Sequence, residues 1–176
     1  MLIVNLYGAP GAGKSTGAAY IFSRLNMAGV NVDLVTEFAK DKVWEESKTA
    51  FENQVYIFGE QFFRISRLEG KVDVVVTDSP LMLNSYYGKD DIRLGDEFNA
   101  LVKKISNSYD TLDIFFQRVK PYNPLGRRHT EAESDSISDE LLEFLNKNGV
   151  KPIMFAGDIS GYDSIVGITL DLLKRK

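Results

Sequence analysis

Eight residues near the N-terminus have the types and the spacing that bind nucleotide phosphates. Residues 8–15 read GAPGAGKS and fit the pattern G-x-x-x-x-G-K-[ST], the P-loop. Glycines let the backbone turn its N–H groups toward an anion, and the N-terminus of a following helix adds its positive dipole end. Lys14 would bind the β- and γ-phosphates, and the Ser15 hydroxyl is a ligand for Mg²⁺. We therefore expect the nucleotide at Gly8, Gly11, Ala12, Gly13, Lys14, Ser15 and Thr16.

Two acidic residues follow apolar runs, where the carboxyl ends of parallel strands would bring them to one edge of a sheet. Asp78 ends the run VVVTD, which has the form of a Walker B element, and we expect its carboxylate to hold Mg²⁺ beside Ser15. Glu37 follows another apolar run, and its carboxylate is suited to accept the proton of an attacking hydroxyl. The alternatives are that Asp78 only caps a turn and that Glu37 is an exposed helix residue.

A long segment without helical or strand periodicity, residues 118–136, contains two prolines, a glycine, three arginines and the single histidine. Phosphoryl transfer needs positive charge on the transferring group and exclusion of water, and a closing segment supplies both. We expect a mobile lid that carries Arg118, Arg127 and Arg128 to the site. The alternative is a solvated loop whose arginines pair with the acidic residues of the same segment.

Other side chains have the chemistry to bind the substrates. Gln54 and Gln61 are one heptad apart on a predicted helix, so they lie roughly on one face, and an amide can read a nucleobase. Arg64 adds a cation to the same helix. Gly157 and Asp158 follow the last predicted strand, where backbone groups would lie under the adenine of ATP. The alternatives are exposed amides on a helix surface and an ordinary strand-to-helix turn.

The elements that position these residues alternate along the chain. Apolar runs rich in β-branched residues predict strands at residues 2–6, 31–36, 72–77, 111–116 and 152–155. Amphipathic spacing predicts helices at residues 14–27, 51–69, 91–106, 138–148 and 163–175. This alternation favours parallel βαβ units in a three-layer α/β fold. The length of 176 residues suits one domain, residues 1–176.

Composition narrows the function classes. The chain has no cysteine, which excludes disulfides and cysteine-based metal sites. Its net charge of −4 argues against tight, non-specific binding to nucleic acid. No apolar run approaches the ~20 residues that span a bilayer. The first apolar run is too short for a signal-peptide core, so we expect a cytoplasmic protein with no membrane partner. The sequence does not indicate an oligomeric state.

The P-loop, Glu37, Asp78 and the arginines of the predicted lid together resemble the P-loop nucleoside and nucleotide kinases. The resemblance is nearest to nicotinamide riboside kinase domains and to small, phage-type P-loop kinases grouped with AAA proteins. It implies a five-stranded parallel sheet of order 2-3-1-4-5. It also implies that Glu37 contacts the acceptor hydroxyl and that Arg118, Arg127 and Arg128 are lid arginines. Deoxynucleoside kinases usually have Glu-Pro and Glu-Arg-Ser where this chain has Glu37-Phe38 and Asp78-Ser79-Pro80.

The sequence thus predicts an ATP- and Mg²⁺-dependent kinase that transfers the γ-phosphoryl group to a hydroxyl or phosphate. The acceptor would be a nucleoside, a nucleotide or a related ribosyl compound. Two alternatives stay open. One is a kinase acting on a hydroxymethylated base in phage DNA, which the phage resemblance raises. The other is an ATPase switch that regulates a partner protein. ATP is preferred to GTP because the chain lacks an Asn-Lys-x-Asp motif.

Overall fold

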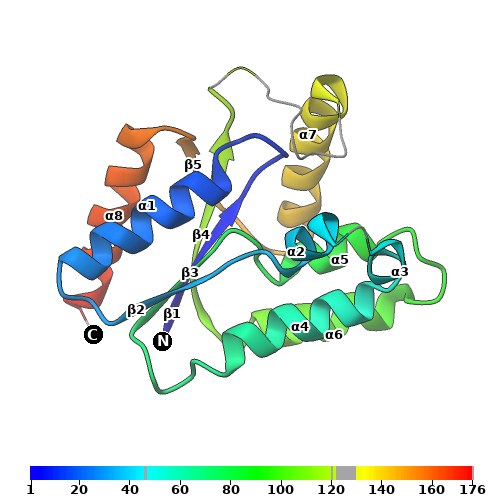
Figure 1. The fold of residues 1–176 in the computed structure, drawn as a ribbon, viewed down its shortest axis with the longest axis horizontal. Helices are drawn as coiled ribbons and strands as arrows, with labels where there is room; N and C mark the ends of the chain where they lie inside the picture. The colour runs from blue at the N-terminus through cyan, green and yellow to red at the C-terminus, as the bar shows by residue number, and fades with distance from the viewer. Residues whose placement is uncertain (46, 120, 122–129, 176) are drawn as a thin grey trace.

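A computed structural model describes residues 1–45, 47–119, 121 and 130–175 (Figure 1). Within this part of the chain, five strands form one parallel sheet of order β2-β3-β1-β4-β5. The predicted order is therefore confirmed. The strands are β1 (Leu2–Tyr7), β2 (Val32–Val35), β3 (Val74–Thr77), β4 (Asp110–Gln117) and β5 (Ile153–Ala156).

Helices cover both faces of the sheet and make a three-layer molecule (Figure 1). One face carries α1 (Lys14–Met27) and α8 (Ile159–Leu173). The opposite face is covered by α4 (Gln54–Ser66), α5 (Met82–Gly88), α6 (Gly95–Ser106) and α7 (Glu131–Lys147). Two short helices, α2 (Phe38–Trp44) and α3 (Lys48–Phe51), connect β2 to α4 and pack against α4.

Each central strand is buried on both faces, because its side chains alternate between the two helix layers. On β1, Val4 packs toward α1 and α8, whereas Ile3 packs toward the helices of the other layer. Val76 and Val75 divide in the same way on β3, and both are fully buried. Apolar side chains pack over both faces of the sheet, so a ligand would bind at the carboxyl ends of the strands.

The helix ends follow local capping rules. The predicted helix 14–27 is confirmed as α1, and Gly29, at φ 82°, ends it while the Val30 N–H donates to the Leu25 carbonyl. The helix predicted at 138–148 begins earlier, at residue 131. Thr130 and Glu133 form a capping box there, a signal present in the sequence.

This early start corrects the predicted structure of the lid segment. Residues 131–136 are the first turns of α7, so the irregular loop predicted at 118–136 is wrong over that stretch, and the function of the segment as a lid stays a prediction. Residues 120 and 122–129 lie outside the described residues. Three short helices, α2, α3 and α5, were not predicted as separate elements. Across the part of the chain that the structure describes, no helix is long and apolar enough to cross a membrane.

Candidate active site

The P-loop leaves β1 and enters α1 through three glycines in the left-handed half of backbone space. Gly8, Gly11 and Gly13 have φ of 140°, 91° and 99°. Side chains larger than hydrogen are strained at these angles, so the loop shape depends on glycine. The Lys14 ammonium donates to the carbonyls of Gly8 at 2.8 Å and Ala9 at 3.2 Å. Those bonds place the cation over the loop, where nucleotide phosphates bind in P-loop proteins.

The segment after β5 packs directly on the P-loop. A Cβ atom on Gly157 would lie 2.0 Å from the Ala12 carbonyl oxygen, so only glycine fits this contact. The hydroxyl of Tyr162, on α8, lies 3.1 Å from the carbonyl oxygen of Gly13 and 3.0 Å from that of Gly157. Asp158 caps α8 by accepting from a backbone N–H. Gly157 and Asp158 therefore adjoin the P-loop, and their contact with adenine stays a prediction.

Helix α7 contacts the other side of the loop. The Ser134 hydroxyl is fully buried and donates to the Pro10 carbonyl at 2.7 Å. Sequence reasoning missed both Ser134 and Tyr162 because each lies more than a hundred residues from its partner in the P-loop. No pattern of spacing reports such a contact.

The predicted lid arginines have separate outcomes. The Arg118 side chain is 16% exposed and forms ion pairs with Glu131, at 2.8 Å, and with Asp135. Both carboxylates lie in the first turns of α7, where the positive end of the helix dipole stabilises negative charge. Arg118 thus ties the end of β4 to α7. Arg127 and Arg128 lie outside the described residues.

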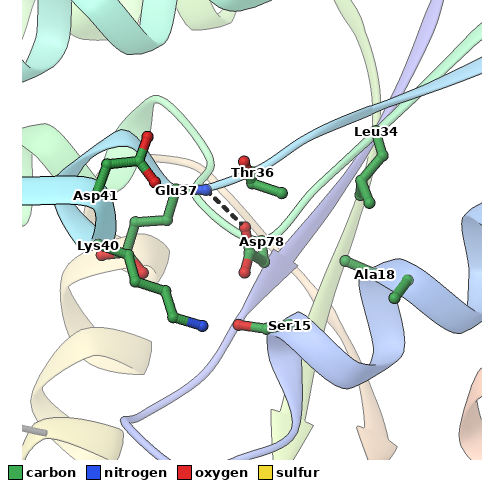
Figure 2. Close-up of a pocket in the computed structure, with 9 residues that line it drawn as sticks. Ser15, Ala18, Leu34, Thr36, Glu37, Lys40, Asp41 and Asp78 are labelled. Carbon is green, nitrogen blue, oxygen red and sulfur yellow. Dashed lines mark hydrogen bonds between the residues drawn. The ribbon is translucent and has the colours of Figure 1, made fainter. Parts of the chain in front are cut away.

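A cavity of about 290 Å³ opens between α1, the end of β2 and the end of β3 (Figure 2). Ser15 faces it from the P-loop helix, and Glu37 and Asp78 face it from the two strand ends. The predicted meeting of these three residues is observed. The complete lining consists of Ser15, Ala18, Ala19, Leu34, Thr36, Glu37, Lys40, Asp41 and Asp78.

Glu37 and Asp78 are joined through the backbone. The Glu37 N–H donates to Asp78 Oδ1 at 3.0 Å, and the Asp78 side chain is buried (Figure 2). Burial raises the pKa of the half-buried Glu37 carboxyl, and the negative charge of Asp78 adds to that rise. The positive charge of Lys14 acts on the Glu37 pKa in the opposite direction. A carboxylate with a raised pKa is a stronger base than a solvated one.

The residues predicted to read the substrate lie mostly in internal contacts. Gln61 is 1% exposed, and its Oε1 accepts from the Phe38 N–H at 3.0 Å. The Gln54 amide is half-buried and donates to Asn84 at 2.8 Å. Arg64 pairs with a carboxylate of α2 at 2.7 Å. Contact of these three side chains with substrate stays a prediction.

Tyr87, on α5, is a further residue near Glu37. Its ring is half-exposed, yet desolvation of the hydroxyl and the negative charge of Glu37 both raise its pKa. The nearby Lys40 lines the cavity with its ammonium group toward Ser15 (Figure 2). Sequence reasoning gave no role to Tyr87, because the helix that carries it was not predicted.

The oxygen ligands fit a magnesium ion bound together with a nucleotide. Ser15 offers a hydroxyl and Asp78 a carboxylate to the same cavity. Among the described residues, no group of three or more His, Cys, Asp and Glu side chains is arranged to hold a metal alone. Mg²⁺ usually keeps several waters and takes the rest of its ligands from one or two side chains and substrate phosphates. The arrangement therefore suits a metal that arrives with phosphates.

Comparison with known families places the chain. The model of an AAA domain family matches residues 3–160. The chain belongs to this AAA domain family. No curated protein matches it.

Two solved structures have the same fold. One is a NadR protein in complex with NR, with a TM-score of 0.69 and 17% identity over 96% of this chain and 50% of that one. The chain thus spans half the length of that relative. The other is deoxyadenosine kinase from M. mycoides with the products dCMP and a flexible dCDP bound, with a TM-score of 0.56 and 17% identity over 99% and 100% of the two chains. The predicted resemblance to P-loop nucleoside kinases is confirmed at the level of the fold.

Proposed function

We propose that this protein is an ATP-dependent kinase that phosphorylates a hydroxyl of a nucleoside-like small molecule. The observation that carries the proposal is the cavity where Ser15, Glu37 and Asp78 meet beside the P-loop lysine. Phosphoryl transfer to a hydroxyl requires a phosphate site, a metal site and a carboxylate base close together, and this cavity combines residues suited to all three.

In the proposed reaction the acceptor binds with its hydroxyl against Glu37. The Glu37 carboxylate takes the hydroxyl proton while the acceptor oxygen bonds to the γ-phosphorus of ATP. The bond from that phosphorus to the β–γ bridging oxygen breaks, and ADP leaves. Lys14 neutralises charge that builds on the phosphoryl oxygens and the bridging oxygen. Bound Mg²⁺ would add further charge neutralisation, held by Ser15 and Asp78.

Other residues would bind the rest of the two substrates. Gly157 and Asp158 adjoin the P-loop and are proposed to contact the adenine of ATP. Gln54, with Asn84, is proposed to present a polar group to the acceptor. Arg118 lies at the end of β4 and would support the phosphoryl group if its ion pairs with α7 open. We propose the same function for Arg127 and Arg128.

The ligands of the two similar structures support the proposed acceptor class. One protein is in complex with NR, and the other has dCMP bound as a product. Both ligands are nucleoside-like compounds, which supports an acceptor of that class for this chain. The carboxylate between the P-loop and the ends of two strands suits the hydroxyl of such a compound.

The test is ATP consumption by the pure protein with a panel of acceptors. The panel holds nucleosides, nucleoside monophosphates, nicotinamide riboside and hydroxymethylated DNA. We expect strong stimulation by one small molecule and a product heavier by one phosphoryl group in the mass spectrum. Phosphorylated DNA would favour the nucleic-acid alternative. Hydrolysis that is the same with every acceptor would contradict the proposal and favour an ATPase switch.

A further inference from the structure

The turn between β2 and α2 carries Glu37 and is held at two consecutive backbone amides. The Glu37 N–H donates to Asp78 Oδ1 at 3.0 Å. The next N–H, that of Phe38, donates to Gln61 Oε1 at 3.0 Å. Asp78 follows β3 and Gln61 lies on α4, so two separate elements hold one turn. Because both adjacent amides are hydrogen-bonded, the backbone at Glu37 is fixed, and so is the direction of its Cα–Cβ bond.

Gln61 is polar although its side chain lies in the interior of the protein. Its side chain is 1% exposed, and among the described residues its Nε2 has no hydrogen-bond partner. A buried N–H without an acceptor is unfavourable, and an apolar residue of the same length would avoid that penalty. Among the described residues, the one hydrogen bond of this amide is that in which Oε1 accepts from the Phe38 N–H. The polarity of Gln61 is therefore explained by the Glu37 turn.

Arg64, one turn further along α4, holds the same segment from its exposed side. Its guanidinium donates to the Thr36 carbonyl at 3.4 Å and pairs with Asp41 at 2.7 Å. The guanidinium carbon also lies 5.0 Å from the centre of the Phe38 ring, within cation–π range. Helix α4 thus contacts the residue before Glu37, the residue after it and the first turn of α2.

We propose that Gln61, supported by Arg64, is a positioning residue that fixes Glu37 for proton transfer and does not itself touch substrate. The inference rests on the proposed function, in which Glu37 is the base. It replaces the contact with substrate that the sequence predicted for Gln61 and Arg64. Rate depends steeply on such alignment, since a misplacement of about 1 Å can cost on the order of 100-fold. The contacts of Gln61 and Arg64 described above go to residues 36–41 and not to the P-loop, so we expect nucleotide binding to be independent of Gln61.

The kinetic test compares Gln61→Met with Gln61→Glu. Methionine keeps the length but removes the amide oxygen, whereas glutamate keeps an oxygen at the position that accepts from Phe38. We expect Gln61→Met to lower kcat by roughly 10- to 100-fold with the KM for ATP unchanged, and Gln61→Glu to recover most of the loss. Wild-type kcat in Gln61→Met, or equal loss in both variants, would overturn the proposal.

Two further variants separate positioning from folding. Arg67→Met, at the exposed C-cap of α4, introduces the same side chain away from the turn and should leave kcat unchanged. Arg64→Met removes the outer support, and we expect a smaller kcat loss than in Gln61→Met, again without change in the KM for ATP. If Gln61→Met fails to fold, Arg64→Met decides the matter, and wild-type kcat in that variant contradicts the proposal.

Amide hydrogen exchange, followed by NMR, tests positioning without any reaction. We expect the Phe38 and Glu37 amides to exchange at least 10-fold faster in Gln61→Met, while the Gly17 amide, bonded to the Gly13 carbonyl, keeps its wild-type rate. Unchanged exchange at Phe38 overturns the inference. A wild-type protein that phosphorylates no acceptor, but shows this exchange pattern, would refute the proposed function and leave the positioning contact established.

Discussion

The P-loop and the β2–α2 turn face the same cavity but keep their shapes by different means. The P-loop takes most of its shape from its own residues, with three glycines at positive φ and a lysine that folds back on its carbonyls. Ser134 and Tyr162 add hydrogen bonds to its carbonyls from outside. The β2–α2 turn takes its shape from side chains far away in the sequence, Asp78 and Gln61. The phosphate site is thus locally encoded, whereas the proposed base depends on tertiary packing.

This difference has a consequence for mutation. Damage to the P-loop should come mainly from substitutions inside it, and such substitutions should remove nucleotide binding. Damage to the turn should come from residues in other elements, and it should remove transfer while nucleotide still binds.

The largest effect is expected for Lys14→Ala, which removes the cation of the P-loop. Loss of one preorganised group that stabilises transition-state charge typically costs about 10²–10³ in kcat, and this cation also holds phosphates in the ground state. We expect turnover to fall at least that far and ATP affinity to fall with it, measured by steady-state kinetics and calorimetry. Lys104→Ala, on the exposed side of α6, is the matched control and should behave as wild type. Wild-type turnover in Lys14→Ala would refute a P-loop phosphate site.

Asp78 belongs to both regions, and two substitutions separate its roles. Asp78→Asn keeps an oxygen for the Glu37 N–H but loses the negative charge, whereas Asp78→Ala loses both. We expect both variants to need more Mg²⁺ for half-maximal rate. Asp78→Ala should in addition have the lower kcat at saturating Mg²⁺, by about 10-fold. Equal kcat values at saturating Mg²⁺ would show that the hydrogen bond to Glu37 does not matter.

Gly13→Ala tests how far local backbone geometry fixes the P-loop. A Cβ there lies 2.5 Å from the Tyr162 hydroxyl oxygen, at a φ of 99°. Gly29→Ala is the matched control, since its φ is 82° and the Cβ meets no atom within 4 Å. The left-handed conformation alone costs about 1–2 kcal/mol in each case. We expect Gly13→Ala to lose more unfolding free energy, measured in urea, than Gly29→Ala. We expect only Gly13→Ala to lose ATP binding.

Glu37 should reduce the stability of the protein without ligands at neutral pH. Burial raises the pKa of its carboxyl in the folded state, so the folded protein retains this proton at a pH where the unfolded chain has lost it. The free energy of unfolding therefore falls as pH rises through the pKa that the Glu37 carboxyl has in the folded protein. In the presence of a chelator, Glu37→Gln should be more stable than wild type at pH 7. The difference should disappear below the ordinary glutamate pKa, near 4.3.

The two regions also differ in how well the sequence predicted them. The P-loop and α1 followed from glycine spacing and from amphipathic spacing, and the strands followed from apolar runs, all of which are local patterns. The order of the strands in the sheet was implied only by the resemblance to P-loop kinases. Glu37 and Asp78 could be placed at the site because both follow parallel strands. The position of Gln61 could not be predicted, because periodicity gives the face of a helix but not the backbone amide that the face meets.

Other misses have equally specific causes. The start of α7 was placed too late because proline, glycine and arginines before it are typical of a loop, while the capping box at Thr130 and Glu133 was overlooked. Helix α5 was missed because its buried Met82 to Tyr86 stretch shows no alternation between polar and apolar faces. Ser134 and Tyr162 contact the P-loop only through the tertiary fold.

The most direct test of the central claim follows the γ-phosphoryl group of labelled ATP in a single turnover, with the acceptor that the panel selects. We expect wild-type protein to move the label to the acceptor, and Glu37→Gln to bind ATP as tightly but to transfer the label more slowly by about 10²–10⁴. Label that appears only as inorganic phosphate, at a rate independent of acceptor and of Glu37, would refute the proposed kinase.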